Sequence, residues 1–226
     1  MSIFDTLTEL PLFKGVSRET MSRTVGNYRF EFKKYAPGEI IVKAGAPCRS
    51  VIFILSGKVN SSLSLSDDLR IVQILPANVM IDTEFLFGKH TSHPASISAE
   101  DRVAVLEISN NDFIGIIASD TVFMFNYLNI LSRKSQKIFD NYPVTGSLLS
   151  QLTTITDFFT DPKATQITVC FHPDTERAFG MSPEQFSSEA SKLLEKKLIA
   201  NFDGMAVYIS DRSRLLEAGH CINDNR

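Results

Sequence analysis

The chain has 226 residues, 43% of them hydrophobic and 22% charged, and its formal net charge is −3 at pH 7. This composition is typical of a globular protein, and the length allows one large domain or two small ones. No apolar run approaches the roughly 18 residues that span a membrane, and no secretory signal is visible, so we expect a cytoplasmic protein without membrane partners. The three cysteines, Cys48, Cys170 and Cys221, are far apart and give neither a disulfide framework nor a zinc pattern.

The first half of the chain predicts short helices followed by many short strands. Residues 1–34 are expected to form one or two helices, with Ser17 as an N-cap. Residues 35–59 predict two strands, IIVK and SVIFIL, separated by turns at glycines and prolines. The second of these is apolar on both faces, which is typical of a strand inside a barrel or sandwich. Further strands are predicted at Ser61–Leu65, Arg70–Leu75, Ser96–Ala99 and Val103–Ile108. This spacing favours an all-β roll or sandwich.

A helical pattern replaces the strands at Ser109. The cluster Ser-Asn-Asn-Asp predicts a helix N-cap, and a longer helix is expected from Asp120 to about Asn141. Apolar residues recur along it with a period of seven. Either this helix packs on its own roll, or it forms the seam of a homodimer. The seam would contain Met124, Leu128, Leu131, Ser135 and Ile138.

The last third of the chain predicts a winged helix. Pro143 ends the long helix, a helical run follows at 148–159, and a strand is expected at Thr165–Phe171. The next residues predict a helix-turn-helix. Its first helix is expected at His172–Phe179, its turn at Gly180-Met181, and its second helix after the N-cap Ser182. Gln185 is placed to complete a capping box, and the buried face is expected at Phe186, Ala190, Leu193 and Leu194. Asp203-Gly204 between two apolar strands predicts a hairpin with a type I′ turn.

Two of these stretches resemble a known family. Tyr-x-Pro-Gly-Glu-x-Ile at 35–41, followed by an apolar strand and x-x-Gly-x-Val, is similar to the opening of a cyclic-nucleotide-binding β-roll. That roll is the sensor half of the catabolite activator (CRP/FNR) family of bacterial transcription regulators, and Leu12–Ser17 is similar to its helical lead-in. The resemblance implies an α+β fold: a sensor β-roll (a double-stranded β-helix) at 1–119, a dimerisation helix at 120–142, and a winged helix-turn-helix DNA-binding domain at 143–226.

The resemblance also implies a function. We expect an effector-responsive homodimer that regulates transcription, with these partners: double-stranded DNA carrying a two-fold-symmetric operator, RNA polymerase and a small-molecule effector. No motif of an enzyme is present. An alternative is a protein-interaction or ligand-sequestering module with a degenerate winged helix. Charge favours this alternative, because residues 143–226 carry 8 Lys and Arg against 11 Asp and Glu, a net of −3.

Within the predicted recognition helix, the pattern departs from the family. Members commonly have Ser-Arg-Glu-Thr-x-Ser-Arg, whereas this chain has Ser182-Pro183-Glu184-Gln185-Phe186-Ser187-Ser188. Both arginines are lost, so a preference for guanine at those positions is not expected, while Glu184 could accept from cytosine and Gln185 could read adenine. The expected DNA-binding residues are Ser182, Glu184, Gln185, Ser187, Ser188, Lys192 and Arg212.

The effector pocket departs from the family as well. Nucleotide-binding members hold the phosphate with a Gly-Glu pair and an Arg-Ser pair, which correspond here to Asp82-Thr83 and His93-Pro94. A carboxylate replaces the glycine, and a histidine, mostly neutral at pH 7 by its ordinary pKa, replaces the arginine. Cyclic AMP binding is therefore not expected. The candidate pocket comprises Asp82, Thr83, Glu84, His93, Ser132 and Arg133.

No cofactor can be assigned. Some sensors of the family bind haem, and His90 and His93 are the candidate ligands in this loop. A loop histidine is far more often solvated than bound to iron, so haem is not expected. An iron–sulfur cluster needs four thiolates, and the chain has three cysteines.

Overall fold

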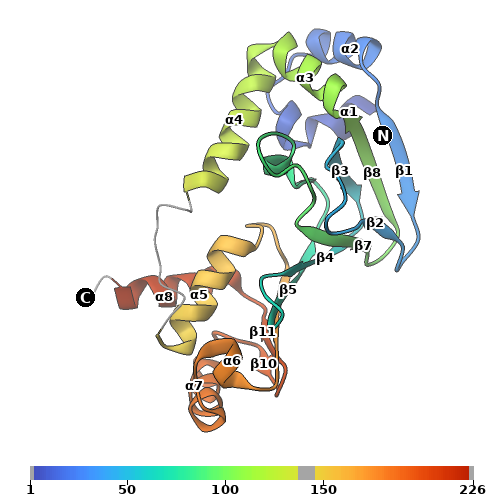
Figure 1. Cartoon of the computed structure of the whole chain (residues 1–226). Helices are drawn as coiled ribbons and strands as arrows, with labels where there is room; N and C mark the ends of the chain where they lie inside the picture. Colours follow the sequence, from blue (N-terminus) through green and yellow to red (C-terminus); the bar gives the residue numbers. More distant parts are fainter. Residues whose placement is uncertain (1–2, 137–145, 224–226) are drawn as a thin grey trace. The chain divides into compact units, whose positions relative to one another are not determined.

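The computed structural model describes residues 3–136 and 146–223, and the chain divides into two compact units (Figure 1). Unit 1 contains Met1–Val59 and Pro76–Gln136. Unit 2 contains Asn60–Leu75 and Lys137–Arg226. The predicted functional division at 119 and 142 stays a prediction, since the compact units group the residues differently: one hairpin from the sensor segment belongs to unit 2.

Unit 1 is a β-roll with helices at both of its sequence ends. Its helices are α1 (Ile3–Thr8), η1 (Pro11–Phe13), α2 (Arg18–Asn27), η2 (Thr83–Phe85), α3 (Asn110–Ser119) and α4 (Thr121–Gln136). Its strands are β1 (Glu31–Tyr35), β2 (Ile40–Val42), β3 (Ser50–Ser56), β6 (Val79–Ile81), β7 (Ala95–Ala99) and β8 (Val103–Ser109). Strands β1-β8-β3-β6 form one antiparallel sheet, and β2 pairs with β7.

The centre of the roll is the pair β3 and β8. As its apolar sequence predicts, β3 is buried on both faces, from Val51 through Ile54. Its register with β8 runs from Ser50↔Ser109 to Ser56↔Ala104. The turn after β3 requires glycine, since Gly57 has φ +82° and a Cβ there would lie 2.4 Å from the backbone oxygen of Arg102. The predicted strand SVIFIL is thus confirmed as β3, and the predicted strand IIVK is confirmed as β2 except for Lys43, which lies beyond its end.

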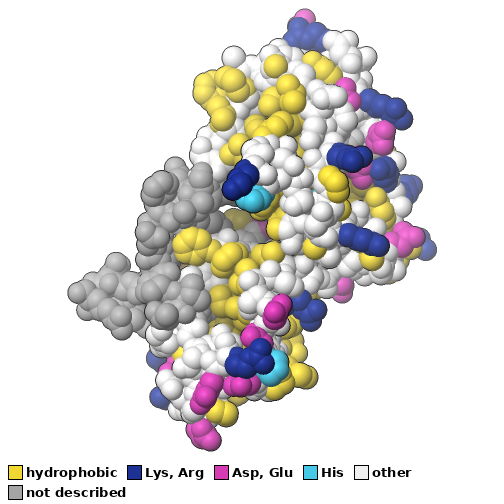
Figure 2. Space-filling view, in the orientation of Figure 1, with side chains coloured by type: hydrophobic (Ala, Val, Ile, Leu, Met, Phe, Trp, Pro, Cys, Tyr) yellow, Lys and Arg dark blue, Asp and Glu magenta, His cyan; other side chains and the backbone are white. Residues whose placement is uncertain are grey.

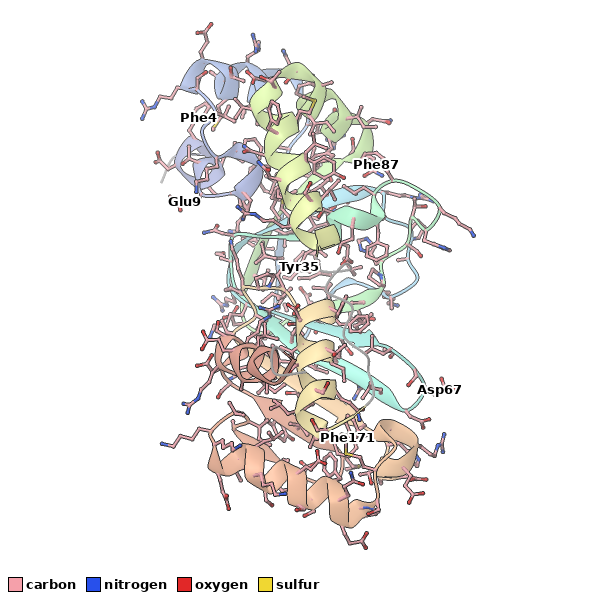
Figure 3. All side chains as sticks on the ribbon, turned by 90° about the vertical axis from the view of Figure 1, so that its left-hand side faces the viewer. Phe4, Glu9, Tyr35, Asp67, Phe87 and Phe171 are labelled. Atoms are coloured by element: carbon pink, nitrogen blue, oxygen red, sulfur yellow. The ribbon has the colours of Figure 1, made fainter. Side chains whose placement is uncertain are left out.

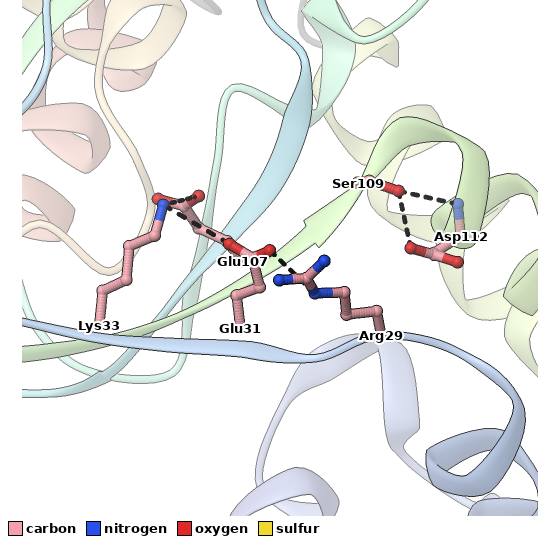
Figure 4. A network of polar contacts seen from close by, with 6 residues as sticks. All are labelled: Arg29, Glu31, Lys33, Glu107, Ser109 and Asp112. Atoms are coloured by element: carbon pink, nitrogen blue, oxygen red, sulfur yellow. Dashed lines mark hydrogen bonds and ion pairs between the residues drawn. The ribbon is translucent and has the colours of Figure 1, made fainter.

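Strand β1 lies in the segment for which helices were predicted, so that part of the prediction was wrong. The sequence Glu-Phe-Lys-Lys-Tyr shows no buried alternation, and the strand forms because it pairs with β8 along its whole length. Glu31 is directly opposite Glu107, a repulsive pair, and the amine of Lys33 lies between the two carboxylates (Figure 4). The hydrogen bond from Lys33 to Glu107 raises the pKa of Lys33.

An aromatic core joins the helices of unit 1 to the roll. Phe13, Phe53, Phe113 and Phe123 are fully buried, and the rings of Phe13 and Phe123 meet edge to face at 5.4 Å. The predicted caps form: Ser17 accepts from the amide of Thr20, and Ser109 accepts from that of Asp112 (Figure 4). Phe123 therefore anchors the start of α4 in the core of unit 1.

Unit 2 combines the C-terminal elements with the hairpin β4–β5. Its helices are α5 (Leu148–Phe159), α6 (Thr175–Phe179), α7 (Pro183–Glu195) and α8 (Arg212–Asn223), and its strands are β4 (Val59–Ser64), β5 (Leu69–Leu75), β9 (Gln166–Phe171), β10 (Asn201–Phe202) and β11 (Ala206–Ile209). The strand order is β10-β11-β9-β5-β4. Phe171, Phe179 and Phe186 pack together with ring centroids 5.0 to 5.5 Å apart. This cluster joins the sheet to the helix pair α6–α7.

The helix pair follows the prediction with three differences. Helix α6 begins at Thr175 rather than at His172, because Asp174 caps it by accepting from two backbone amides. Gly180 turns the chain with φ +66°, and Ser182 caps α7 by accepting from the amide of Gln185. The second half of the capping box is absent, since the Gln185 side chain donates to Glu189 instead. Leu194, predicted to be buried, is 38% exposed.

The hairpin β10–β11 forms as predicted, with a different turn. Its register places Phe202 opposite Val207, and the amide of Asp203 donates to the carbonyl of Ala206. Neither Asp203 nor Gly204 has a positive φ, so the turn is not type I′. The Asp203 carboxylate instead accepts from the amide of Met205, an Asx-type contact that fixes the turn without the left-handed region.

Among the described residues, no single helix is long and apolar enough to cross a membrane. The pair α3 and α4, bent by 117°, meets the criterion of length and composition only when the two are taken together.

Candidate effector site and nucleic-acid interface

The candidate effector site is built on an aspartate in a glycine-like conformation. Asp82 follows the buried strand β6 and has φ +48° and ψ +34°, in the left-handed region. Asparagine and aspartate tolerate this region better than most side chains do, though glycine favours it most. The position that the family pattern gives to glycine thus has, in this chain, a backbone conformation that glycine favours. Asp82 ends β6 and starts the 3₁₀ turn η2.

His93 reaches the same place from the far end of the loop. Its backbone is fixed by two hydrogen bonds, since the His93 amide donates to the carbonyl of Ala46 and the His93 carbonyl accepts from the amide of Gly45. Its ring is 5% exposed, and Nδ1 lies 2.7 Å from the Asp82 carboxylate. Nδ1 also lies 3.6 Å from Sγ of Cys48, which is buried beside it. Two residues 11 positions apart thus form a pair in which His93 is buried and Asp82 is half-buried.

The charge state of His93 differs from the sequence prediction. The hydrogen bond to Asp82, and secondarily that to Cys48, raise the pKa of His93 to about 9, although burial acts in the opposite direction. At pH 7 the ring is therefore a cation, whereas its ordinary pKa predicted a mostly neutral ring. The site holds an imidazolium and a carboxylate in contact, not a neutral histidine.

An aromatic residue of α4 contacts Thr83, the residue that follows Asp82. The hydroxyl of Tyr127 donates to the carbonyl of Thr83 over 3.1 Å, and the Tyr127 ring packs edge to face on Phe113 and Phe87. Burial raises the pKa of Tyr127 to about 12, so this hydroxyl remains a donor. Thr83 is fully buried, and its hydroxyl donates to Glu84, which is exposed.

The remaining predicted pocket residues lie elsewhere. Ser132 and Arg133 are exposed on α4, one turn or more beyond Tyr127. His90 is exposed in the loop, while His93 is committed to Asp82, so the two do not converge as a pair of haem ligands. Among residues 3–136 and 146–223, no group of three or more metal-ligating side chains could hold a metal ion.

At Asp82 the positive charge of His93 and the negative charge of the carboxylate balance each other. In the family pattern a fixed cation at the position of His93 would attract an anionic ligand. Here the cation already has an anionic partner from the same chain, at hydrogen-bonding distance and almost excluded from water. A second anion would have to displace Asp82 or lie beside it, and both changes are costly in a buried site.

The exposed face of α7 is the candidate nucleic-acid interface. Glu184, Gln185, Ser187, Ser188 and Lys192 are exposed on it, and Ser182 is half-buried at its N-cap. The hydroxyl of Ser182 donates to Glu184 over 2.9 Å, and this bond, after the backbone bond, lowers the pKa of Glu184. The structure brings these six predicted residues onto one helix and its cap. Glu184 presents a carboxylate, not a neutral acid.

Arg212 lies on a different element, at the start of α8. Its side chain is 14% exposed, and its guanidinium donates to the carboxylate of Asp157 over 3.0 Å and to the hydroxyl of Thr160 over 3.2 Å. These contacts join α8 to α5. A role of Arg212 in DNA binding stays a prediction.

An apolar stripe runs along the exposed side of α4. Met124 is 40% exposed and Leu128 is 46% exposed. Phe125, which the heptad pattern did not select, is 60% exposed. Figure 2 shows yellow side chains gathered over α4. Leu131 is half-buried and packs against the core of unit 1, and the Ser135 side chain and Ile138 lie outside the described residues.

The sequence reasoning missed two residues of the effector site. Tyr127 stands one position before Leu128 in the heptad, so the same periodicity that selected Leu128 could have placed it on the roll-facing side. Cys48 follows the turn Gly45-Ala46-Pro47 in a segment that carried no recognisable ligand pattern. Its proximity to His93 depends on the pairing of loops 45 residues apart.

Comparisons with known proteins agree with this fold. Residues 32–120 match the family described as "Cyclic nucleotide-binding domain". The structure resembles that of the Thermus thermophilus catabolite activator protein, with a TM-score of 0.51 and 18% identity, covering 94% of this chain and 99% of that one. It also resembles the sensor domain of the transcriptional regulator DNR from Pseudomonas aeruginosa, with a TM-score of 0.51, 15% identity, and coverage of 63% and 95%. No curated protein matches the sequence.

Proposed function

The chain contains a cyclic nucleotide-binding domain and has the fold of CRP/FNR-type regulators, and from this premise we propose that it is a DNA-binding transcription regulator that acts as an effector-responsive homodimer. Its partners are then two-fold-symmetric double-stranded DNA, a second copy of the chain, RNA polymerase and a small-molecule effector. The role is regulatory and not catalytic.

The observation that carries the proposal is the exposed polar face of α7. The helix follows α6 after a left-handed glycine turn, and the hairpin β10–β11 lies in the same sheet as β9. This order of elements is that of a winged helix, whose second helix enters the major groove. Glu184 and Gln185 stand at the start of that helix, where side chains reach base edges.

The roll serves as a sensor without the usual nucleotide chemistry. The Asp82–His93 pair supplies, within the chain, the anion that a nucleotide would bring. We therefore propose that the effector is not cyclic AMP, and that it acts by shifting the population of α4 arrangements through Tyr127, which bonds to the backbone of Thr83.

Dimer formation is proposed along α4. The exposed Met124, Phe125 and Leu128 form an apolar surface that a second copy of the same helix would cover. A dimer is also what a two-fold-symmetric operator requires, because each recognition helix reads one half-site.

A protein-interaction module remains a second candidate. The face of α7 has a carboxylate at Glu184 and lacks arginine at the family's two reading positions. A basic partner protein would suit this charge better than a phosphate backbone does.

Selection of bound sequences from a random pool of DNA duplexes at low salt tests the proposal. We expect enrichment of a two-fold-symmetric sequence, with cytosine or adenine, rather than guanine, opposite Glu184 and Gln185. Absence of any enriched sequence would refute the regulator and favour the protein-interaction module.

A pair of charge reversals identifies the surface that binds. Lys192→Glu on α7 should weaken binding of the selected duplex about tenfold or more. Lys58→Glu, an equal change on an exposed residue of unit 1, is the matched control and should leave the affinity within about twofold. Equal effects of the two changes would mean that α7 is not the interface.

A further inference from the structure

The hairpin β4–β5 is the part of the sensor segment that unit 2 incorporates. Strand β5 pairs with β9 from Leu69↔Phe171 to Ile74↔Gln166. Ile71 is fully buried in the core that contains Phe171, and Leu65 and Leu69 pack against that core. The edge of β9 that a free winged helix would expose is therefore covered by β5 along six residues.

Both ends of this pairing are held by further hydrogen bonds. At one end, the side-chain oxygen of Gln73, which is 8% exposed, accepts from the amide of Asp161 over 2.8 Å. At the other end, the carbonyl of Asp68 accepts from the amide of His172 over 3.0 Å. The hairpin is thus fixed at its base and at its tip, which Asp67 marks in Figure 3. The hairpin is therefore part of the sheet and of the core of unit 2.

The tip engages a cation of the helix-turn-helix. The carboxylate of Asp68 lies 2.8 Å from the guanidinium of Arg177, the basic residue of α6. In a helix-turn-helix the first helix crosses the DNA backbone, so a cation on it is placed to neutralise a phosphate. Here a carboxylate of the sensor segment holds that cation, while the side chain of Arg177 remains 54% exposed. The Asp68 carboxylate thus contacts Arg177 as a DNA phosphate would.

We propose that the hairpin β4–β5 is an autoinhibitory element: its docking on β9 and its Asp68–Arg177 ion pair hold the winged helix in a form of low DNA affinity, and its release raises that affinity. The inference rests on the proposed DNA binding. The effector then acts through the hairpin, which continues directly from the turn at Gly57 in the roll, as well as through α4.

Neutralising the tip tests the ion pair. Asp68→Asn should raise the affinity for the selected duplex about tenfold and steepen its dependence on salt by nearly two in the logarithmic slope for a dimer, since one cation per chain is released to phosphate. Asp67→Asn removes the same charge from the neighbouring exposed position and is the matched control. An equal gain in both variants, or a lower affinity in Asp68→Asn, would overturn the inference.

Locking the hairpin tests the docking itself. Arg70 is directly opposite Cys170, so Arg70→Cys places two thiols across the β5–β9 pair at a separation suited to a disulfide. Oxidation, checked by the mass of the 70–170 cross-linked peptide, should lower the DNA affinity at least tenfold, and reduction should restore it. Arg70→Ser, with the same loss of charge and one partner thiol, should not respond to oxidation.

The outcomes separate the inference from the function on which it rests. If the locked and reduced forms bind DNA equally well, the hairpin is not inhibitory, and the regulator proposal stands. If the cross-link does not form, β5 does not dock on β9 and the inference fails. If neither the wild type nor the reduced variant binds any duplex at low salt, the DNA-binding proposal fails and the inference fails with it.

Discussion

At the scale of single residues, the candidate site is defined by the pairing of Asp82 with His93. The aspartate has a left-handed backbone conformation, and its carboxylate lies against the histidine that stands where the family pattern has arginine. Relative to that pattern, one change adds an anion, and the other leaves a cation that this anion neutralises. The two changes compensate each other. Either one alone would leave an unpaired charge away from water, which is costly.

Removing the carboxylate should expose this compensation. Asp82→Asn is expected to lower the free energy of unfolding by roughly 3 kcal/mol, the usual loss when one partner of a buried pair is removed. The pKa of His93 should fall from about 9 toward 6.5, because its largest stabilising hydrogen bond is lost. Titration of the His93 ring protons by NMR measures this pKa, and unfolding in urea measures the free energy. Glu84→Gln, which removes an exposed carboxylate two residues along the chain, is the control. An unchanged His93 pKa in Asp82→Asn would contradict the pair.

The same pair predicts how stability depends on pH. His93 has a pKa raised from 6.5 to about 9 in the folded protein, so its contribution is complete below pH 6.5 and is lost as the pH rises through 9. The free energy of unfolding in urea should therefore decrease between pH 6.5 and 9. In His93→Gln this decrease should largely disappear. A wild type whose stability is level across that window would show that the ring is neutral.

Sequence reasoning selected both residues but assigned the wrong charge to one of them. Their correspondence to the family pattern was sufficient to find Asp82 and His93. The protonation state depends on a 2.7 Å contact between residues 11 positions apart, and no property of an isolated histidine contains it. Tyr127 was missed for a similar reason, since its role comes from the packing of α4 on η2.

At the scale of elements, α4 presents two chemically different sides. Phe123 and Tyr127 are buried in unit 1, while Phe125 and Leu128 face outward. The heptad pattern found the helix and part of this exposed side, but it also assigned Leu131 to the seam, although Leu131 packs on the core of its own unit. A helix of period 3.6 drifts against a seven-residue repeat, which explains why a sequence count alone does not fix the side.

Charging the exposed side should abolish the dimer. In Phe125→Glu/Leu128→Glu the apolar stripe carries two like charges, and sedimentation should give the mass of one chain. Phe32→Glu places the same change on β1, at a residue 51% exposed, and should leave the dimer intact. If the double variant keeps the mass of two chains, the dimer does not use this side of α4. Leu131→Glu would be a poor test, because it also disrupts unit 1.

The strands divide into those that a local pattern predicts and those that need a partner. Strand β3 has continuous apolar residues and was found, whereas β1 has two lysines and a glutamate in five residues and was not. Strand β1 exists because β8 offers an edge and because Lys33 neutralises the facing glutamates. The sequence of such a strand shows no strand pattern of its own, and only its pairing with β8 identifies it.

At the scale of the whole molecule, the family pattern can be restored as a test. Wild-type protein should show no heat of binding with 1 mM cyclic AMP, which corresponds to an affinity weaker than about −4.1 kcal/mol. The variant Asp82→Gly, Thr83→Glu, His93→Arg, Pro94→Ser carries the family's residues on this backbone and should bind it measurably. Calorimetry at pH 7 checks both. Binding by the wild type would contradict the self-occupied site. The variant Asp82→Gly, Thr83→Glu, Pro94→Ser is the control, because it lacks only the arginine.

The hairpin β4–β5 makes unit 2 discontinuous along the chain. This affects how unit 2 folds during synthesis and how it can be exchanged between relatives. Strand β5 leaves the ribosome roughly a hundred residues before β9, so the core of unit 2 closes by a distant pairing, which slows folding. A chimera joined near Pro143 would separate β9 from the strand that completes its sheet. Exchange of the C-terminal region between relatives should therefore keep the β5–β9 pairing, and with it the low-affinity form, only when residues 60–75 are exchanged as well.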